Sequence, residues 1–271
     1  MPELPEVETI KSQLSKDIAG KKILDVEIFL PKIVKVSKQK FKRATVGARI
    51  KKIARRAKIL IFELDNGWSF LMHLKLTGQL IFNGQKNKHT HVIFRFSDRS
   101  HLLFNDLRQF GYIKLVKTAD LPGFLEKEKL GPEPLNKDFT LEDFQAILAK
   151  KPKTKIKQFL MDPKNIAGIG NIYSDEILFE AGVLPGRPAE NLTPSEIKKI
   201  FDAAKHILAW AVKLRGTSAS DYLDAHGQKG KFLAQLKVYG REGENCVKCE
   251  GKIQRLKMNG RSAHFCPICQ K

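Results

Sequence analysis

The sequence predicts an α+β chain of several domains, and three observations lead to this fold class. Short runs of alternating apolar and polar residues fill the first half, whereas helical periodicity fills most of the second half. All four cysteines lie in the last 26 residues. We expect an N-terminal β-sandwich with a leading helix, then a helical C-terminal domain that ends in a β-hairpin held by the cysteines.

The leading helix is expected directly behind the first residues. Apolar side chains recur at i, i+3 and i+7 in Val7, Ile10 and Leu14, which predicts an amphipathic helix to about Lys16. Pro5 suits the first turn of that helix, because its missing N–H has no partner there in any case.

The same stretch allows a chemical role for Pro2. Removal of Met1 would leave Pro2 with a free secondary amine, and an α-amino pKa of roughly 7.7–8.0 leaves part of it neutral and nucleophilic. Such an amine forms a charged iminium with an aldehyde-level carbon. Glu3 and Glu6 would share a helix face near it. Acids in a first turn also simply suit the helix dipole, so both interpretations stay open here.

Seven short strands are expected after this helix, at residues 23–30, 50–56, 59–64, 68–74, 91–96, 101–104 and 112–116. Turn signals rich in Asn, Asp and Gly separate them. Seven strands with one helix over about 115 residues are typical of a sandwich or a barrel. We place this N-terminal domain at residues 1–130 and predict the sandwich.

The character of the chain changes at residues 131–134, an extended Gly-Pro-Glu-Pro breaker that begins a linker over 131–136. Helices are predicted at about 140–150, 155–161, 172–181 and 193–214, from N-cap signals and glycine stops. Residues 217–231 are polar and are expected to form a flexible loop. We place a helical domain at 137–237 and a terminal module at 238–271.

The terminal module carries two Cys-x2-Cys pairs separated by 16 residues, a spacing typical of tetrahedral zinc–thiolate sites. Four thiolates leave no open coordination position, so one structural zinc ion is expected. Asn259-Gly260 between two strand-like runs predicts a tight hairpin, with Arg261 just after its tip. The predicted ligands are Cys246, Cys249, Cys266 and Cys269.

The charge of the chain points to a polyanionic partner. Lysine and arginine number 49 against 29 acids, a formal net charge of +20 that is spread through both halves. Nucleic acid is therefore expected, and a membrane surface is the second choice because no basic amphipathic helix with aromatic anchors stands out. The sequence has no run of 18 apolar residues and no apolar core of a signal peptide, so we expect a cytoplasmic protein.

One glycine-rich motif suits contact with phosphate. Residues 168–171, Gly-Ile-Gly-Asn, can bring backbone N–H groups and the Asn171 side chain close to a phosphate. Lys153 and Lys157 lie just upstream and favour this interpretation. A plain turn between two helices would leave the same pattern.

Polar residues of the first domain have two interpretations each. Lys58 opens an apolar strand, either beside a site or as an edge position. His73 and His89 suit phosphate or base contacts, or structural hydrogen bonds. Arg108 and Phe110 share one loop, where they can read and wedge a base stack or merely end a strand.

Taken together, these motifs resemble the bacterial formamidopyrimidine-DNA glycosylases, bifunctional enzymes of base excision repair that remove oxidised purines such as 8-oxoguanine and act as AP lyases. The resemblance runs nearly end to end. It rests on residues 2–9 (Pro-Glu-Leu-Pro-Glu-Val-Glu-Thr), 55–58 (Arg-Arg-Ala-Lys), 88–91 (Lys-His-Thr-His), 107–111 (Leu-Arg-Gln-Phe-Gly), 130–135 (Leu-Gly-Pro-Glu-Pro-Leu), 168–173 (Gly-Ile-Gly-Asn-Ile-Tyr) and 238–243 (Val-Tyr-Gly-Arg-Glu-Gly).

The resemblance implies a catalytic centre. Pro2 would attack C1′ of the damaged nucleotide and displace the base, while Glu3 protonates the sugar ring oxygen and Glu6 supports the site. Lys58 would assist β-elimination. Arg261 would bind the phosphates that flank the lesion and support δ-elimination.

The resemblance also implies a helix–two-turn–helix element, damaged duplex DNA as partner, a monomer and a nucleoid-associated location. The implied DNA contacts are His73, His89, Arg108, Lys153, Lys157 and Asn171, with Phe110 and Leu76 in the base stack. Leu76 stands where the family usually has methionine, and Arg215-Gly216 stands where it often has Gly-Gly.

Two alternatives remain beside this interpretation. An endonuclease VIII-type glycosylase has the same scaffold but removes oxidised pyrimidines; Leu4 argues against it, because that branch typically has glycine there. A non-catalytic zinc protein that binds damaged DNA or structured RNA would explain the charge and the cysteines, but it would leave Pro2 and Glu3 without a purpose.

Overall fold

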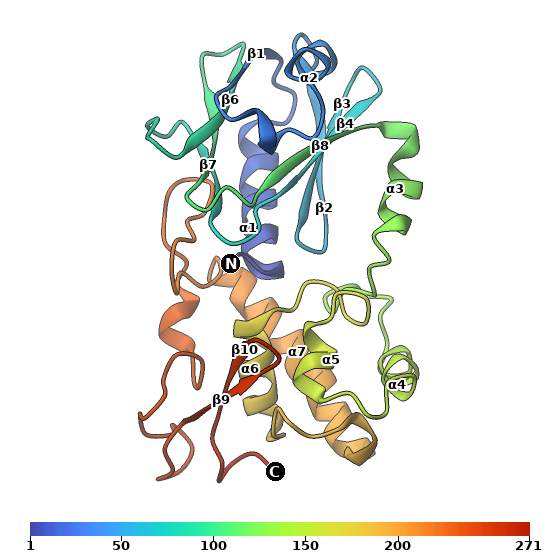
Figure 1. Cartoon of the computed structure of the whole chain (residues 1–271), viewed down its shortest axis with the longest axis vertical. Coiled ribbons are helices and arrows are strands. Elements are labelled where there is room, and N and C mark those ends of the chain that lie inside the picture. Colours follow the sequence, from blue (N-terminus) through green and yellow to red (C-terminus); the bar gives the residue numbers. More distant parts are fainter. The chain divides into compact units, whose positions relative to one another are not determined.

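The computed structural model describes residues 1–271 as two units (Figure 1). Unit 1 comprises residues 1–128 and 214–233, and unit 2 comprises residues 129–213 and 234–271. The segment 214–233, which we expected in the helical domain, therefore packs with the N-terminal unit. The expected linker packs with unit 2, because Gly131 N donates to Pro163 O and Ala167 N donates to Pro132 O.

Unit 1 contains two four-stranded antiparallel sheets, which confirms the predicted sandwich. One sheet has the order β1 (Ile23–Ile28), β6 (Thr90–Phe96), β7 (His101–Asp106) and β5 (Gly78–Phe82). The other has the order β2 (Ile50–Arg56), β3 (Ile59–Leu64), β4 (Trp68–His73) and β8 (Tyr112–Lys117).

Aromatic rings join the two sheets in the core of unit 1. Phe70 of β4 stacks on Phe94 of β6 with ring centroids 5.2 Å apart, and Phe62 stacks on the other side of Phe70 at 4.6 Å. Helix α1 (Leu4–Asp17) buries its predicted apolar face in the same core. Burial of these side chains is what gives the N-terminal residues a fixed place.

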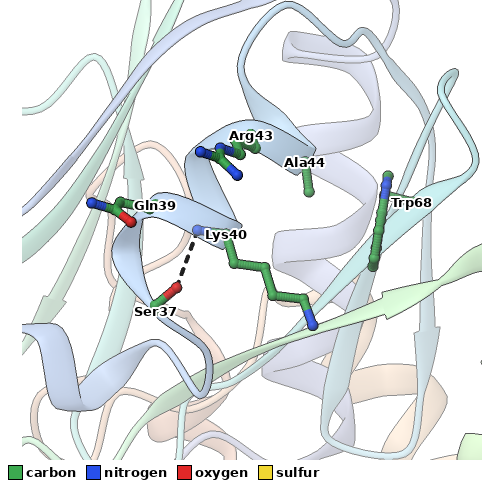
Figure 2. Close-up of a pocket in the computed structure, with 6 residues that line it drawn as sticks. All are labelled: Ser37, Gln39, Lys40, Arg43, Ala44 and Trp68. Atoms are coloured by element: carbon green, nitrogen blue, oxygen red, sulfur yellow. Dashed lines mark hydrogen bonds between the residues drawn. The ribbon is translucent and has the colours of Figure 1, made fainter.

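Three elements of unit 1 were not expected from the sequence: α2 (Lys38–Thr45), β5 and α3 (Leu121–Lys127). Helix α2 is short and basic, and its apolar face is little more than Phe41 and Ala44. An open pocket of about 390 Å³ lies beside it. Figure 2 shows its lining residues, among them Lys40 of α2 and Trp68. None of the residues predicted to carry chemistry lines this pocket.

Unit 2 contains the four predicted helices, α4 (Leu141–Ala149), α5 (Ile156–Met161), α6 (Asn171–Ala181) and α7 (Pro194–Lys213). Thr140 caps α4 in a capping box, and Gly182 ends α6 in the left-handed conformation, as predicted. Strands β9 (Gln254–Met258) and β10 (Arg261–Phe265) form the terminal hairpin. Short 3-10 turns lie at Pro31–Ile33, Thr118–Asp120, Ala189–Asn191 and Phe232–Gln235. None of the helices combines the length and apolarity that crossing a bilayer requires.

Candidate active site and nucleic-acid interface

The N-terminal residues of unit 1 form a buried acidic turn around Pro2. Glu3 is the N-cap of α1, and its backbone N–H donates to Glu6 Oε2 at 2.7 Å as part of a capping box. Both glutamates are only 1% exposed. Pro2 is buried and directly precedes the N-cap Glu3, and Glu6 lies in the first turn of α1, so the three residues that the sequence predicted to act together lie at one helix N-terminus.

The second oxygen of Glu6 holds a segment from the other end of unit 1. Thr217 N donates to Glu6 Oε1 at 2.7 Å. Gly216 has a φ of +78°, and a Cβ there would lie 2.6 Å from Glu6 Oε1. The neck of this loop is closed by a bridge between Thr217 and Lys231. The loop that the sequence suggested to be flexible is therefore anchored on Glu6, and its close approach requires a glycine.

The far half of the same loop is docked on α1. Asp224 is fully buried and accepts hydrogen bonds from Gln13 Nε2 at 3.0 Å and Arg215 Nη1 at 2.6 Å. Ala225 N donates to Gln13 Oε1 at 2.9 Å. Tyr222 lies in the hydrophobic core, where burial and the nearby carboxylates raise its pKa well above the usual value. Arg215, one of the departures from the family pattern, thus has a defined partner.

Lys58 lies on a turn that is tied to α1. The turn joins β2 to β3, and Ala57 adopts a φ of +52° in it. Arg55 donates from Nη1 to Ala57 O and from Nε to Glu8 Oε2, both at 2.8 Å. Burial tends to raise the pKa of Glu8, but hydrogen bonds from Lys11 and Arg55 lower it overall. An ionised Glu8 therefore holds the Lys58 turn against the helix that carries Pro2.

The loop with Arg108 and Phe110 is clamped by a buried aspartate. Asp106 Oδ1 accepts from Thr77 Oγ1 at 2.5 Å and from Arg108 N at 3.2 Å, and Oδ2 accepts from Gly111 N at 2.7 Å. The Arg108 guanidinium lies 5.0 Å from the centre of the Phe110 ring, which is 54% exposed. An exposed aromatic ring on a rigid loop suits insertion into a base stack.

His73 is neutral at physiological pH. Burial, followed by the positive charges of Lys75, Lys58 and Lys114, lowers its pKa to about 3. Lys75 N donates to His73 Nδ1 at 3.0 Å, which places the ring proton on Nε2. His73 can therefore donate a hydrogen bond to a phosphate oxygen, but it does not add a positive charge.

Two further predicted contacts, His89 and Leu76, lie in loops before β6 and β5. The carbonyl oxygen of His89 accepts from Asp106 N at 3.0 Å, so the histidine loop is tied to the clamped loop. Leu76 is half-buried in a turn that Gly78 N closes on Leu74 O at 2.9 Å. The loop of Leu76 also contacts Asp106, through the hydroxyl of the next residue, Thr77.

The glycine-rich turn of unit 2 opens helix α6. Gly168 has a φ of +105°, Gly170 is the N-cap, and Asn171 is the first helical residue. Asn171 Oδ1 is buried without a hydrogen-bond partner. Lys153 is exposed on the segment before α5. A helix N-terminus attracts anions, the Asn171 side-chain NH2 can donate a hydrogen bond, and Lys153 supplies a positive charge from the preceding segment, so this element suits contact with phosphate.

Lys157 differs from the expectation of a surface contact with DNA. Its side chain is 1% exposed, and Nζ lies 2.5 Å from Asp175 Oδ1 and donates to Ser262 O at 2.9 Å. A buried ammonium engaged in this way is not available at the surface. The structure places Lys157 inside unit 2, where it joins α5 to α6 and to the terminal hairpin.

The four cysteines fit one zinc ion. Their Sγ atoms all lie within 4.8 Å of one another, and three pairs are 3.3, 3.5 and 3.8 Å apart. A tetrahedral site with Zn–S bonds of about 2.3 Å needs sulfur atoms about 3.8 Å apart. Backbone N–H groups of Lys248, Gly251 and Cys269 donate to three of the sulfurs, which suits thiolates.

The hairpin beside the cysteines has the predicted turn. Asn259 and Gly260 both adopt positive φ angles, 48° and 73°, as a two-residue turn between twisted strands requires. Arg261 follows at the start of β10 and is exposed. Arg261 is therefore exposed next to the turn of a hairpin whose base lies at the zinc site.

The functional residues that the sequence did not reveal are buried polar groups. Asp106 and Asp175 each hold a loop or strand by accepting hydrogen bonds from its backbone, and the backbone N–H of Thr217 is held by Glu6. Asp106 follows a predicted strand and precedes a predicted loop, which is a weak signal for a clamp. Asp175 and Glu176 are adjacent acids in an otherwise largely apolar helix sequence, where acids that become buried need polar partners.

Models of three protein families match the chain in order. They are the formamidopyrimidine-DNA glycosylase N-terminal domain at residues 1–113, the formamidopyrimidine-DNA glycosylase H2TH domain at 130–222, and the zinc finger found in FPG and IleRS at 243–271. Together they cover most of the sequence and follow the order of the sheet, helix and hairpin regions.

Curated relatives and solved structures match over the full length. The formamidopyrimidine-DNA glycosylases of Carboxydothermus hydrogenoformans and Listeria innocua are 47% and 44% identical, with 100% of each chain covered. Lactococcus lactis Fpg in complex with abasic-site DNA is 38% identical with a TM-score of 0.93 over 99% of both chains. The same protein with an N7-benzyl-Fapy-dG DNA gives the same identity and score over 100% of both chains. This chain therefore belongs to the formamidopyrimidine-DNA glycosylase family.

Proposed function

We propose that this protein excises oxidised purines, such as 8-oxoguanine and formamidopyrimidines, from duplex DNA and then cleaves the strand as an AP lyase in base excision repair. Family membership supports a DNA glycosylase. Relatives of the same fold have been solved with abasic-site DNA and with Fapy-dG DNA. The net charge of +20 suits a DNA substrate.

The observation that carries this proposal is the buried turn of Pro2, Glu3 and Glu6. After removal of Met1, the Pro2 amine attacks C1′, the bond from C1′ to the base breaks, and Glu3 protonates the ring oxygen as the sugar opens. The product is an iminium between Pro2 and C1′. Its positive charge acidifies the C2′ proton, and loss of that proton expels the 3′ phosphate.

Residues around this turn have supporting roles. Glu6 holds both the turn and the loop at Thr217 in place. The Lys58 ammonium, on its tied turn, supports β-elimination. Arg108 and Phe110 fill the space that the extruded nucleotide leaves, because a base must leave the stack before C1′ can be reached. His73, His89 and Leu76 line the same DNA-binding region of unit 1.

Unit 2 supplies phosphate contacts. Asn171 at the N-terminus of α6, Lys153 and Arg261 bind the DNA backbone, and Arg261 also supports δ-elimination. The four cysteines hold one structural zinc ion, which stabilises the hairpin that presents Arg261. We further propose that the protein acts as a monomer in the cytoplasm, associated with the nucleoid, because its substrate is there.

Borohydride trapping tests the nucleophile. Reduction in the presence of a duplex with 8-oxoguanine should convert the iminium into a stable adduct, and peptide mass spectrometry should map it to Pro2. The Glu3→Gln variant, which keeps the shape but loses the acid, should trap far less adduct. Intact mass beforehand establishes that Met1 is absent. An adduct at Lys58, or none from an active preparation, would contradict the proposal.

Substrate choice separates this function from that of an endonuclease VIII-type enzyme. We expect faster excision from a duplex with 8-oxoguanine than from the same duplex with thymine glycol. The reverse order would favour the pyrimidine-specific alternative, while trapping at Pro2 would be the same for both.

A further inference from the structure

A buried carboxylate on α6 holds the terminal hairpin of unit 2. Asp175 Oδ1 lies 2.5 Å from Lys157 Nζ, which also donates to Ser262 O at 2.9 Å. Asp175 Oδ2 accepts from His264 N at 3.0 Å and lies 3.0 Å from His264 Nδ1. These contacts form one closed connection between α5, α6 and β10.

The connection occupies the outer edge of β10. Ser262 and His264 are two residues apart in one strand, so their backbone groups point to the same side. Those groups bond to Lys157 and Asp175, so they face away from β9. The side chains of Lys157 and Asp175 therefore bond to the edge of β10 at which a third strand could otherwise pair. They fix how far β10 can slide or rotate against α6.

We propose that Asp175 is a positioning residue for Arg261, which immediately precedes Ser262. This inference rests on the proposed function, in which Arg261 binds a phosphate. Asp175 lies one turn after Asn171 on α6, so a single carboxylate sets the spacing between the two phosphate-binding elements of unit 2. The exposed arginine side chain is long and mobile, and only the backbone that carries it can be fixed from inside.

The sign of the effect on DNA affinity distinguishes positioning from charge. Replacing Asp175 by Asn removes a negative charge from a DNA-binding unit, and charge alone would strengthen binding to a polyanion. Asp175 accepts from Lys157 with one oxygen and from His264 N with the other, whereas Asn has a single acceptor oxygen, so Asp175→Asn loses one of these bonds. Positioning therefore predicts weaker binding, against the direction of the charge change.

The experiment measures the affinity of the zinc-loaded protein for a duplex with a tetrahydrofuran abasic-site analogue as a function of salt. Asp175→Asn should bind about fivefold more weakly, and Arg261→Ala should lower the salt slope by about one phosphate contact. The Asp175→Asn and Arg261→Ala double variant should bind no more weakly than Arg261→Ala alone. Glu180→Gln is the matched control: the same helix and charge change at an exposed acid, which pairs only with His206.

A simple loss of folded protein would lower the active fraction without changing the salt slope, whereas loss of a phosphate contact lowers the slope. If the Asp175→Asn variant does not retain zinc, the His264→Phe variant is used in its place. It removes the contact of the imidazole with Asp175 and keeps the bond from the backbone N–H of residue 264 to Asp175. Additive effects of either variant with Arg261→Ala, or unchanged binding, would overturn the inference. A normal slope for Arg261→Ala would instead contradict the proposed role of Arg261.

Discussion

One buried carboxylate holds the N-terminal turn of unit 1 and another holds the terminal hairpin of unit 2, and the surroundings of the two carboxylates differ. Glu6 in unit 1 accepts two backbone N–H groups next to a core that includes both sheets, α1 and α2. Asp175 in unit 2 pairs with Lys157 and holds a two-stranded hairpin. The apolar cluster of that hairpin has five buried residues, two of which are the metal-site cysteines Cys246 and Cys266. The N-terminal turn is therefore positioned by packing, whereas the hairpin depends on charge pairs and on metal.

Removal of zinc should show this difference most strongly. Because the hairpin has too small a core to fold alone, we expect chelation to weaken DNA binding by a factor on the order of 100 or more and to leave unit 1 folded. Affinity for the abasic-analogue duplex and hydrogen exchange of the sandwich strands measure the two effects. Added zinc should restore binding. Unchanged affinity after complete zinc loss would show that the hairpin does not need the metal.

Gly216→Ala tests the packed side of the comparison. A Cβ at residue 216 would lie 2.6 Å from the hydrogen-bonded Glu6 carboxylate, and φ there is +78°. We therefore expect the free energy of unfolding to fall by about 2–3 kcal/mol and the excision rate to fall about a hundredfold. Gly227→Ala is the matched control in the same loop. The φ of Gly227 is +74°, but no atom lies within 4 Å of a Cβ placed there. We therefore expect Gly227→Ala to lower the free energy of unfolding by only about 1 kcal/mol. Urea unfolding and single-turnover excision measure both, and equal losses would refute the close-approach explanation.

His73 should make the stability of unit 1 depend on pH. Its pKa is about 3 in the folded protein against 6.5 for a free histidine, so below pH 6.5 the unfolded chain binds a proton that the folded one does not. Stability is therefore full above pH 6.5 and falls toward pH 3, by about 1 kcal/mol at pH 5.5. His73→Asn should flatten this dependence in urea titrations at pH 7 and 5.5. The exposed His206→Asn controls for loss of a histidine, and an equal change in both variants would count against His73.

Local patterns predicted most of the fold. Apolar periodicity placed α1 and the four helices of unit 2, and the capping and stop signals at Thr140 and Gly182 placed two of their ends. Asn259-Gly260 and the cysteine spacing placed the hairpin and its metal site. Helix α2 and strand β5 were missed, because each is too short and too polar on its outer face for periodicity to distinguish it from a loop.

Contacts between distant residues could not be predicted in this way. Glu6 and Thr217 are 211 positions apart, and Asp175 and His264 are 89 apart. Lys157 reads as a surface cation among other lysines, and only the burial of Asp175 beside it shows otherwise. The identity of a buried partner depends on packing, which no short stretch of sequence contains.

The return of residues 214–233 to unit 1 has a consequence for how the protein is made. The ribosome releases α1 first, but the partner of Glu6 and the core residues Tyr222 and Ala225 emerge only after all of α7. The sandwich can form early, while the loop that binds Glu6 is added when most of the chain has been synthesised. A nascent chain stopped at the boundary near residue 128 therefore carries Glu6 without the loop that it binds. The N-terminal turn proposed to act in catalysis gains its last contacts only in nearly full-length protein.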